Sequence, residues 1–121
     1  MANILFIHPD HKLIGIYQRH LSSHFTIDSA HDGLSGLRRI RESNPGMVIS
    51  ENNLPYMSGL AILKYVRSHP QHYSLPFLFL TNDEMPEEAL GMGATAWLRQ
   101  SEHGPEQLIP HIFNNYHFVR S

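Results

Sequence analysis

Polar side chains that can do chemistry follow short apolar segments of this sequence. His8, Pro9 and Asp10 come directly after the first apolar segment, and Glu51 lies just beyond the third. A histidine that faces a carboxylate can act as a pH-sensitive switch, because histidine changes its charge in the physiological pH range. Carboxylates suit a hard cation such as Mg²⁺, whereas Pro9 offers no side-chain ligand and the imidazole of His8 is a poor one. This set argues against a magnesium site.

The fourth and fifth apolar segments are also followed by polar residues. Thr81 and Asn82 come after the fourth, and Arg99, Gln100 and Ser101 come after the fifth. In an open parallel sheet, ligands bind beyond the carboxyl ends of the strands, so these side chains are expected to share one pocket with His8 and Glu51. Asparagines in the same loops are further candidates for lining the pocket: Asn52, Asn53 and Asn82.

The elements that position these side chains alternate along the chain. Short apolar segments predict strands over residues 4–7, 25–27, 47–49, 77–80 and 96–98. Between them, apolar residues recur at helical spacing, with Asp10, Ser58 and Pro105 as signals for the starts of helices. The first and fourth strands are continuously apolar, as central strands are, whereas the second alternates like an edge strand. Strand and helix alternating five times predict a doubly wound α/β fold with a parallel sheet.

Length and composition predict one globular domain over residues 1–121, which could be the N-terminal part of a longer protein. The chain has 41% hydrophobic and 17% charged residues, no cysteine and a formal charge of −2. No apolar run reaches the roughly 20 residues of a membrane span, and the first residues lack a secretory leader. We therefore expect a cytoplasmic protein with no membrane contact, and no direct binding of nucleic acid because a basic excess is missing.

One stretch and several shorter motifs carry a family resemblance. Residues 44–60, NPGMVISENNLPYMSGL, look like the run PDLVLLDxxMPxMDGL, and residues 93–98, GATAWL, are similar to GADDYL. The pair Asp32-Gly33 before a helix and Leu80-Thr81 at a strand end agree as well. The chain thus resembles the receiver domains of bacterial response regulators, the CheY-like family, over nearly its whole length. This resemblance implies a flavodoxin-like sheet in the order 2-1-3-4-5 and a role in two-component signalling.

The resemblance also implies a phosphorylation site, and here the sequence departs from the family. The family uses two carboxylates for Mg²⁺, an aspartate that accepts the phosphoryl group, a hydroxyl and a lysine. His8 and Pro9 stand at the acidic pair, Glu51 at the acceptor and Gln100 at the lysine. Because phosphoryl transfer depends on positioning and charge neutralisation, the resemblance implies a pseudo-receiver that is not an enzyme, needs no metal or cofactor, and acts through protein contacts.

Two matches and one shortening concern the switching surface. Thr81 matches the switch hydroxyl of the family and Trp97 its switch aromatic. The stretch from Thr81 to Gly93 is about three residues shorter than usual, close to one helical turn, so the fourth helix should be stunted or irregular. An aromatic patch of Trp97, Tyr116 and Phe118 would favour protein partners or a homodimer through the last strand and helix.

Alternatives remain open for the pocket and for the histidines. Glu51 can be a permanent mimic of a phosphorylated aspartate, a locally hydrogen-bonded glutamate in a disused pocket, or, like His8, a residual acceptor in a phosphorelay. The ten histidines allow a pH- or metal-sensing module, although surface histidines are the simpler interpretation. Their local pairs are His8 and His11, His20 and His24, His69 and His72, and His111 and His117.

Overall fold

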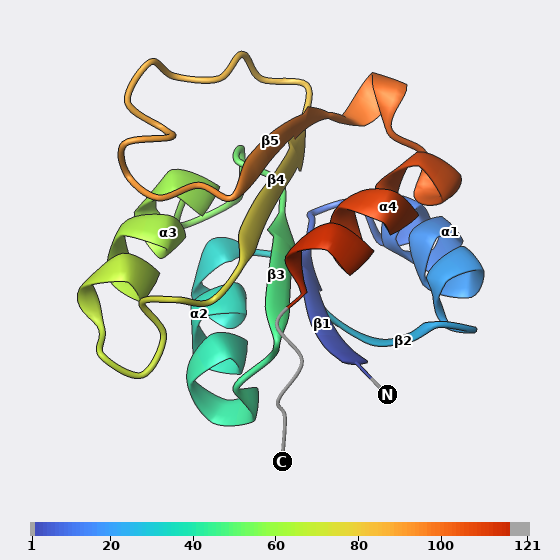
Figure 1. Ribbon diagram of the computed structural model, residues 1–121, viewed down its shortest axis with the longest axis horizontal. Coiled ribbons are helices and arrows are strands. Elements are labelled where there is room, and N and C mark those ends of the chain that lie inside the picture. The colour runs from blue at the N-terminus through green and yellow to red at the C-terminus, as the bar shows by residue number, and fades with distance from the viewer. Residues whose placement is uncertain (1, 117–121) are drawn as a thin grey trace.

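The computed structural model describes residues 2–116 and contains one five-stranded parallel sheet in the order β2-β1-β3-β4-β5 (Figure 1). This is the predicted doubly wound, flavodoxin-like fold. The strands are β1 (Ala2–Ile7), β2 (Phe25–Ala30), β3 (Met47–Ser50), β4 (Phe77–Thr81) and β5 (Ala96–Arg99). The helices are α1 (His11–Leu21), α2 (Gly33–Ser43), α3 (Gly59–Ser68), the short 3-10 helix η1 (Gln100–Glu102) and α4 (Pro105–Asn115).

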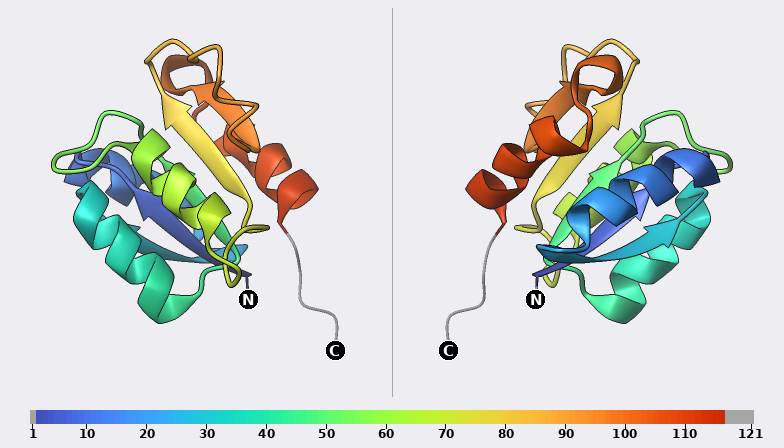
Figure 2. Two further views of the ribbon diagram at one scale, coloured as in Figure 1. Left: turned by 90° about the vertical axis from the view of Figure 1, so that its left-hand side faces the viewer. Right: turned by 90° about the vertical axis from the view of Figure 1, so that its right-hand side faces the viewer.

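The helices cover both faces of the sheet and create two apolar layers. Helices α1 and α4 lie on one face and α2 and α3 on the other, as the side views show (Figure 2). The first layer includes Phe6, Tyr17, Leu21, Leu108 and Ile112. The second includes Leu5, Ile40, Ile62, Leu63 and Phe79. Burial of these side chains is the main stabilising contribution, and it holds the carboxyl ends of the strands in a fixed relation.

Burial follows the predicted positions of the strands. Strands β1 and β4 are interior and β2 is an edge, as the continuous and alternating apolar patterns predicted. Each strand is slightly longer than its apolar segment. For example, β2 continues to Ala30 and β4 to the fully buried Thr81.

Three helices begin at side chains that accept backbone hydrogen bonds. Asp10 caps α1, Asp32 caps α2 by accepting from Ser35 N–H, and Ser58 caps α3. Hydrogen bonding by the Ser35 N–H lowers the pKa of Asp32. The predicted caps Asp10 and Ser58 and the Pro105 start of α4 are confirmed. No helix within the described part of the chain is long and apolar enough to cross a membrane.

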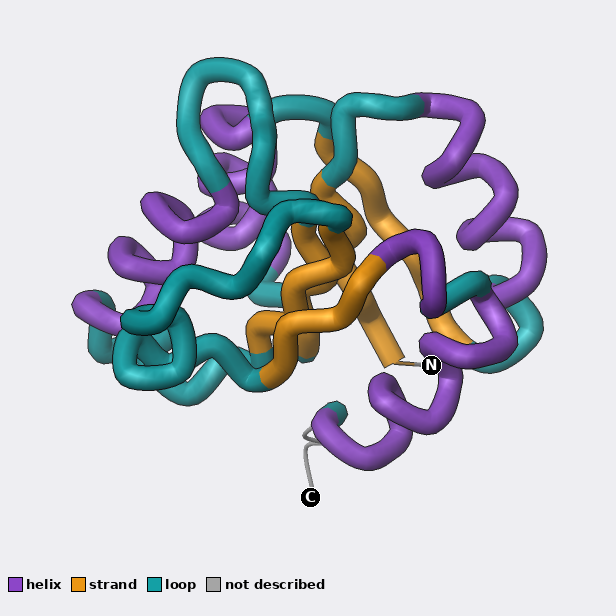
Figure 3. Tube along the Cα trace, turned by 90° about the horizontal axis from the view of Figure 1, so that it is seen from above, coloured by secondary structure: helices purple, strands orange, loops and turns teal. Residues whose placement is uncertain are grey.

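The connection between β4 and β5, where the sequence predicted a stunted or irregular helix, contains no helix, so the fifth strand–helix alternation is missing there. Residues 82–95 form a loop with turns (Figure 3). The Arg67 guanidinium supports this loop: its Nε and one Nη donate to Gly93 O at 3.1 and 2.8 Å, while its other Nη donates to Leu75 O at 2.7 Å. Gly93 has φ 97°, and a Cβ there would lie 2.7 Å from Arg67 Nε. Both facts require glycine at this position.

The last helix is tied to the first strand. Asn3 N–H donates to the phenol oxygen of Tyr116 at 3.0 Å. A Cβ on Gly46 would collide with the same phenol ring, so Gly46 leaves the space that Tyr116 fills. Helix α4 also continues through Pro110, which has no N–H to donate within the helix.

Candidate functional site

The carboxyl ends of β1 and β3 and the start of η1 bring three of the predicted side chains together. His8 Nε2 lies 3.1 Å from Gln100 Oε1 and 3.8 Å from Glu51 Oε1. His8 is only 6% exposed and the Glu51 side chain 13%. The predicted meeting of His8 with Glu51 is therefore present, and Gln100 completes a compact polar group.

The hydrogen bonds of His8 define which of its ring nitrogens carries the proton. Asp10 N–H donates to His8 Nδ1 at 3.0 Å, so Nδ1 is an acceptor and the proton sits on Nε2. Nε2–H then donates to the amide oxygen of Gln100. A second proton on Nδ1 would break the bond from Asp10. Both ring nitrogens of His8 thus have a hydrogen-bond partner.

The Glu51 carboxylate is turned back toward its own loop. Its Oε2 accepts from Asn52 N–H at 2.6 Å and from Asn53 N–H at 3.1 Å. The Glu51 backbone N–H donates to Ile7 O at 2.9 Å, which joins the loop to β1. This geometry agrees with a locally hydrogen-bonded glutamate. Arg99, which the sequence placed in the same pocket, donates to Asn82 O at 3.5 Å.

The two residues that follow His8 do not take part in this polar group. The Asp10 carboxylate accepts from Lys12 N–H at 2.9 Å and from Leu13 N–H at 3.3 Å, so it is engaged in capping α1. Pro9 is exposed and contributes no side-chain ligand. Residues 2–116 contain no group of three histidine, aspartate or glutamate side chains that could hold a metal ion.

Thr81 and Trp97 are linked through the backbone of one residue between them. Thr81 Oγ1 accepts from Asp83 N–H at 3.1 Å, and Trp97 Nε1–H donates to Asp83 O at 3.0 Å. The indole also stacks on Phe79, with ring centroids 4.5 Å apart. The hydroxyl and the aromatic ring that the family resemblance singled out therefore share Asp83 as a common anchor.

Asp83 is the site residue that sequence reasoning missed. Its Oδ2 also accepts from Asn52 Nδ2 at 3.3 Å, while Asn52 Oδ1 accepts from Leu60 N–H at 3.1 Å. Asn82 Oδ1 accepts from Ser101 N–H at 3.0 Å. The loop asparagines thus connect the pocket loops to one another. A threonine two residues before Asp83 was the available signal, because threonine hydroxyls often bond the backbone two residues on.

The predicted aromatic patch does not form as expected. Trp97 packs with the α2 and α3 layer, whereas Tyr116 packs with the α1 and α4 layer on the opposite face of the sheet. The sequence did not reveal this because adjacent elements can place their aromatic rings on different faces. Phe118 and His117 lie outside the described residues.

Histidine ring contacts differ from the pairs suggested by sequence proximity. Two such contacts join histidines within residues 2–116: His11 with His31, and His103 with His111. His69 stacks on Tyr65, and His20 Nδ1 bonds the Ile16 carbonyl one helical turn away. The two histidine–histidine contacts join separate segments of the chain, which proximity in sequence cannot reveal.

Comparison with known proteins supplies the family. A family model described as the response regulator receiver domain matches residues 4–112. Response regulator MprA of Mycobacterium ulcerans is 30% identical over 97 residues, which are 78% of this chain and 41% of that protein. Hybrid signal transduction histidine kinase D of Dictyostelium discoideum is 25% identical over 97 residues, 78% of this chain and 6% of that protein. The chain spans less than half the length of these curated relatives.

Solved structures agree with the fold described above. Chemotaxis response regulator CheY4 of Vibrio cholerae is similar with a TM-score of 0.85 and 26% identity, covering 94% of this chain and 98% of that one. The receiver domain of Francisella response regulator 1452 has a TM-score of 0.85 at 22% identity, covering 96% and 97% of the two chains, and supports the fold alone. With the family match over residues 4–112, the chain belongs to the response regulator receiver domain family of two-component signalling.

Proposed function

We propose that this receiver domain signals without being phosphorylated and acts by binding protein partners. The observation that carries the proposal is the His8–Gln100 hydrogen bond of 3.1 Å beside Glu51. An imidazole and an amide occupy the positions where the family resemblance implies a metal-binding carboxylate and a lysine. Neither side chain can replace the lysine ammonium or the carboxylate that holds the metal ion, and these are the groups that would neutralise a phosphoryl group during transfer.

The position of Glu51 gives further support. Its carboxylate is committed to two backbone N–H groups of its own loop, and it is one methylene longer than aspartate. Thr81, the matching hydroxyl, is committed to Asp83 N–H. Neither group is poised on an incoming phosphoryl, and the local bonds favour a fixed conformation over a permanent mimic of phosphoaspartate.

Intact-mass analysis after incubation with acetyl phosphate and Mg²⁺ tests the proposal. We expect no added mass in the wild-type chain. A gain of about 80 Da, one phosphoryl group, would contradict phosphorylation independence.

A restored variant makes a negative result informative. It combines His8→Asp, Pro9→Asp, Glu51→Asp and Gln100→Lys, and its matched control carries Glu51→Asn with the other three changes. Phosphorylation of the first variant alone would locate the defect of the wild type in these four positions. Circular dichroism of both variants establishes that the fold persists.

The partner surface that we propose is the face of β5 and α4, with a second copy of this chain as partner. Among the described residues no further strand pairs with the outer edge of β5, and Arg99 at the end of this strand is exposed. The formal charge of −2 favours protein over nucleic acid as partner. Sedimentation of the wild type, Arg99→Glu and a matched Arg41→Glu control on α2 tests this surface. A dimer that only Arg99→Glu weakens supports it, whereas a monomer at high concentration, or a dimer that Arg99→Glu leaves unchanged, contradicts it.

A further inference from the structure

Two histidine pairs in residues 2–116 differ in whether their rings can share a ligand. The rings of His11 and His31 are stacked, with centroids 3.6 Å apart and an interplanar angle of 20°. The lone pairs of imidazole lie in the ring plane, so nearly parallel rings cannot direct them at one atom. The rings of His103 and His111 are 5.3 Å apart at 66°, edge to face. Tilted rings at this separation allow two nitrogens to converge.

We propose that His103 and His111 chelate a divalent cation of the borderline class, namely Zn²⁺, Ni²⁺ or Cu²⁺. Imidazole nitrogen is a preferred ligand of these ions. The chain has no cysteine, and no third histidine or carboxylate in the described residues completes a cluster. Water would fill the other coordination positions, which is the arrangement of an open site and not of a closed structural one.

His103 is prepared for this role by two hydrogen bonds. Its Nδ1 lies 2.8 Å from Arg99 O, and because a carbonyl only accepts, Nδ1 carries the proton and Nε2 keeps its lone pair. Metal-binding histidines usually donate their second N–H to a carbonyl or carboxylate in this way. Tyr17 O–H also donates to His103 O at 2.6 Å, so the backbone of the residue is fixed as well.

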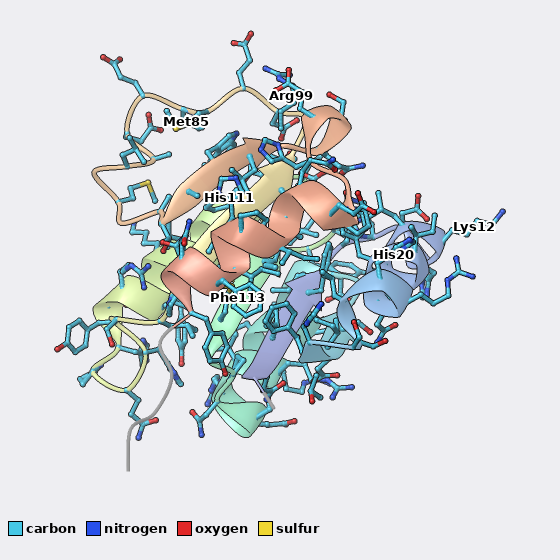
Figure 4. The ribbon with its side chains drawn as sticks, turned by 45° about the vertical axis from the view of Figure 1, so that its right-hand side comes forward. Lys12, His20, Met85, Arg99, His111 and Phe113 are labelled. Atoms are coloured by element: carbon cyan, nitrogen blue, oxygen red, sulfur yellow. The ribbon has the colours of Figure 1, made fainter. Side chains whose placement is uncertain are left out.

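His111 supplies the second nitrogen from a rigid element. It lies on α4, on the flank opposite Phe113 (Figure 4). Its backbone carbonyl accepts from Asn115 Nδ2, but no other described residue hydrogen-bonds its ring nitrogens. The ring is half-buried and its only described ring neighbour is His103.

The charges near the pair favour a cation. Glu102 directly precedes His103, and Glu106 lies in the first turn of α4; both are exposed. Arg99, the nearest cationic residue in sequence, directs its guanidinium to the Asn82 carbonyl.

Calorimetric titration of the untagged full chain with zinc sulfate tests the site. We expect one zinc ion per His103–His111 pair. His103→Ala and His111→Ala should each weaken binding on the order of 100-fold, because loss of one of two linked ligands removes the chelate effect. The matched control, His11→Ala with His31→Ala, removes the stacked pair and should bind zinc as the wild type does.

Nuclear magnetic resonance of the imidazoles gives a second readout that does not depend on heat. Substoichiometric Ni²⁺, which is paramagnetic when bound in this way, should broaden the His103 and His111 ring signals first. Zinc binding that survives both single variants, binding lost in the control, or the absence of both heat and broadening would overturn the proposal. The titration needs no phosphodonor, so its outcome is separate from that of the phosphorylation test.

Discussion

His8 Nε2 donates to Gln100 Oε1 across 3.1 Å, joining the end of the first strand to a residue 92 positions later. In Gln100→Leu the buried donor of His8 loses this acceptor, so we expect the free energy of unfolding to fall by about 1 kcal/mol. Urea denaturation measures the change. Gln71→Leu is the matched control because Gln71 is exposed and should change stability little. An unchanged stability in Gln100→Leu would show that Glu51 or water replaces the lost acceptor.

Because the backbone of Asp83 joins Thr81 to Trp97, variants of Thr81 and of Asp83 should differ in their effect on the fluorescence of Trp97. Thr81→Val keeps the shape but removes the acceptor of Asp83 N–H, so we expect a loss of about 1 kcal/mol and a shift in the emission of Trp97, the only tryptophan. Asp83→Ala keeps the backbone carbonyl that binds the indole, so its emission should stay close to that of the wild type. The reverse order of effects would mean that the Asp83 side chain, not its backbone, holds Trp97.

Among these variants, we expect substitution of Arg67 to cause the largest loss of stability. Its guanidinium is partly buried, which lowers its pKa through desolvation, and it donates to the carbonyls of Gly93, Tyr73 and Leu75. Arg67→Met leaves these carbonyls without their donor, so we expect a loss of about 3 kcal/mol in thermal or urea unfolding.

Two further variants test the role of Arg67 in the loop. Arg67→Lys should restore little, because an ammonium cannot match the planar fork of donors. Arg38→Met, on the exposed side of α2, should be close to neutral. A small effect of Arg67→Met would refute the view that this side chain supports the helix-free connection between β4 and β5.

We expect His72 to contribute to the pH dependence of stability. Burial lowers its pKa, and the nearby His69 adds to the shift. In the unfolded chain the pKa of His72 is about 6.5, whereas in the folded protein it is lower, so the folded ring stays neutral as the pH falls below 6.5. The unfolded state therefore binds more protons in this window, so stability is lost as the pH falls through about 6.5 toward the folded pKa.

Denaturation at several pH values measures this contribution. His72→Leu should flatten the loss of stability on acidification, and the control His20→Leu, with an exposed ring, should not. Equal pH dependence in the wild type and His72→Leu would assign the effect to other groups.

The positions of the strands could be predicted from the sequence because interior strands such as β1 and β4 must be apolar on both faces, which gives continuous apolar runs. The helix caps Asp10 and Ser58 could also be predicted, because a cap depends only on backbone groups a few residues away. The connection 82–95 lay beyond such reasoning. Its stability depends on Arg67, which belongs to α3 and reaches Gly93 across 26 positions. Sequence length indicated a shortened helix, but only the distant guanidinium explains how a loop replaces it.

For the pocket, too, only part of the arrangement could be predicted from the sequence. Fold topology predicted that His8, Glu51 and Gln100 would meet, because the carboxyl ends of parallel strands share one edge of the sheet. It did not predict the hydrogen-bond directions. Asp10 N–H fixes the protonated nitrogen of His8, and the Glu51 carboxylate turns to its own loop. Such choices depend on distances of a few tenths of an ångström, which residue types and spacing do not determine.

The bond from Asn3 N–H to the Tyr116 phenol places the beginning and the end of the described fold side by side. A short linker between these two positions would close the backbone into a ring. New termini could then be opened at residues 84–88, the largely exposed part of the loop between β4 and β5, where the chain has no helix or strand to interrupt. The connectivity of this domain is therefore open to circular permutation, in which β5 and α4 would be synthesised before β1 while keeping their places in the sheet order.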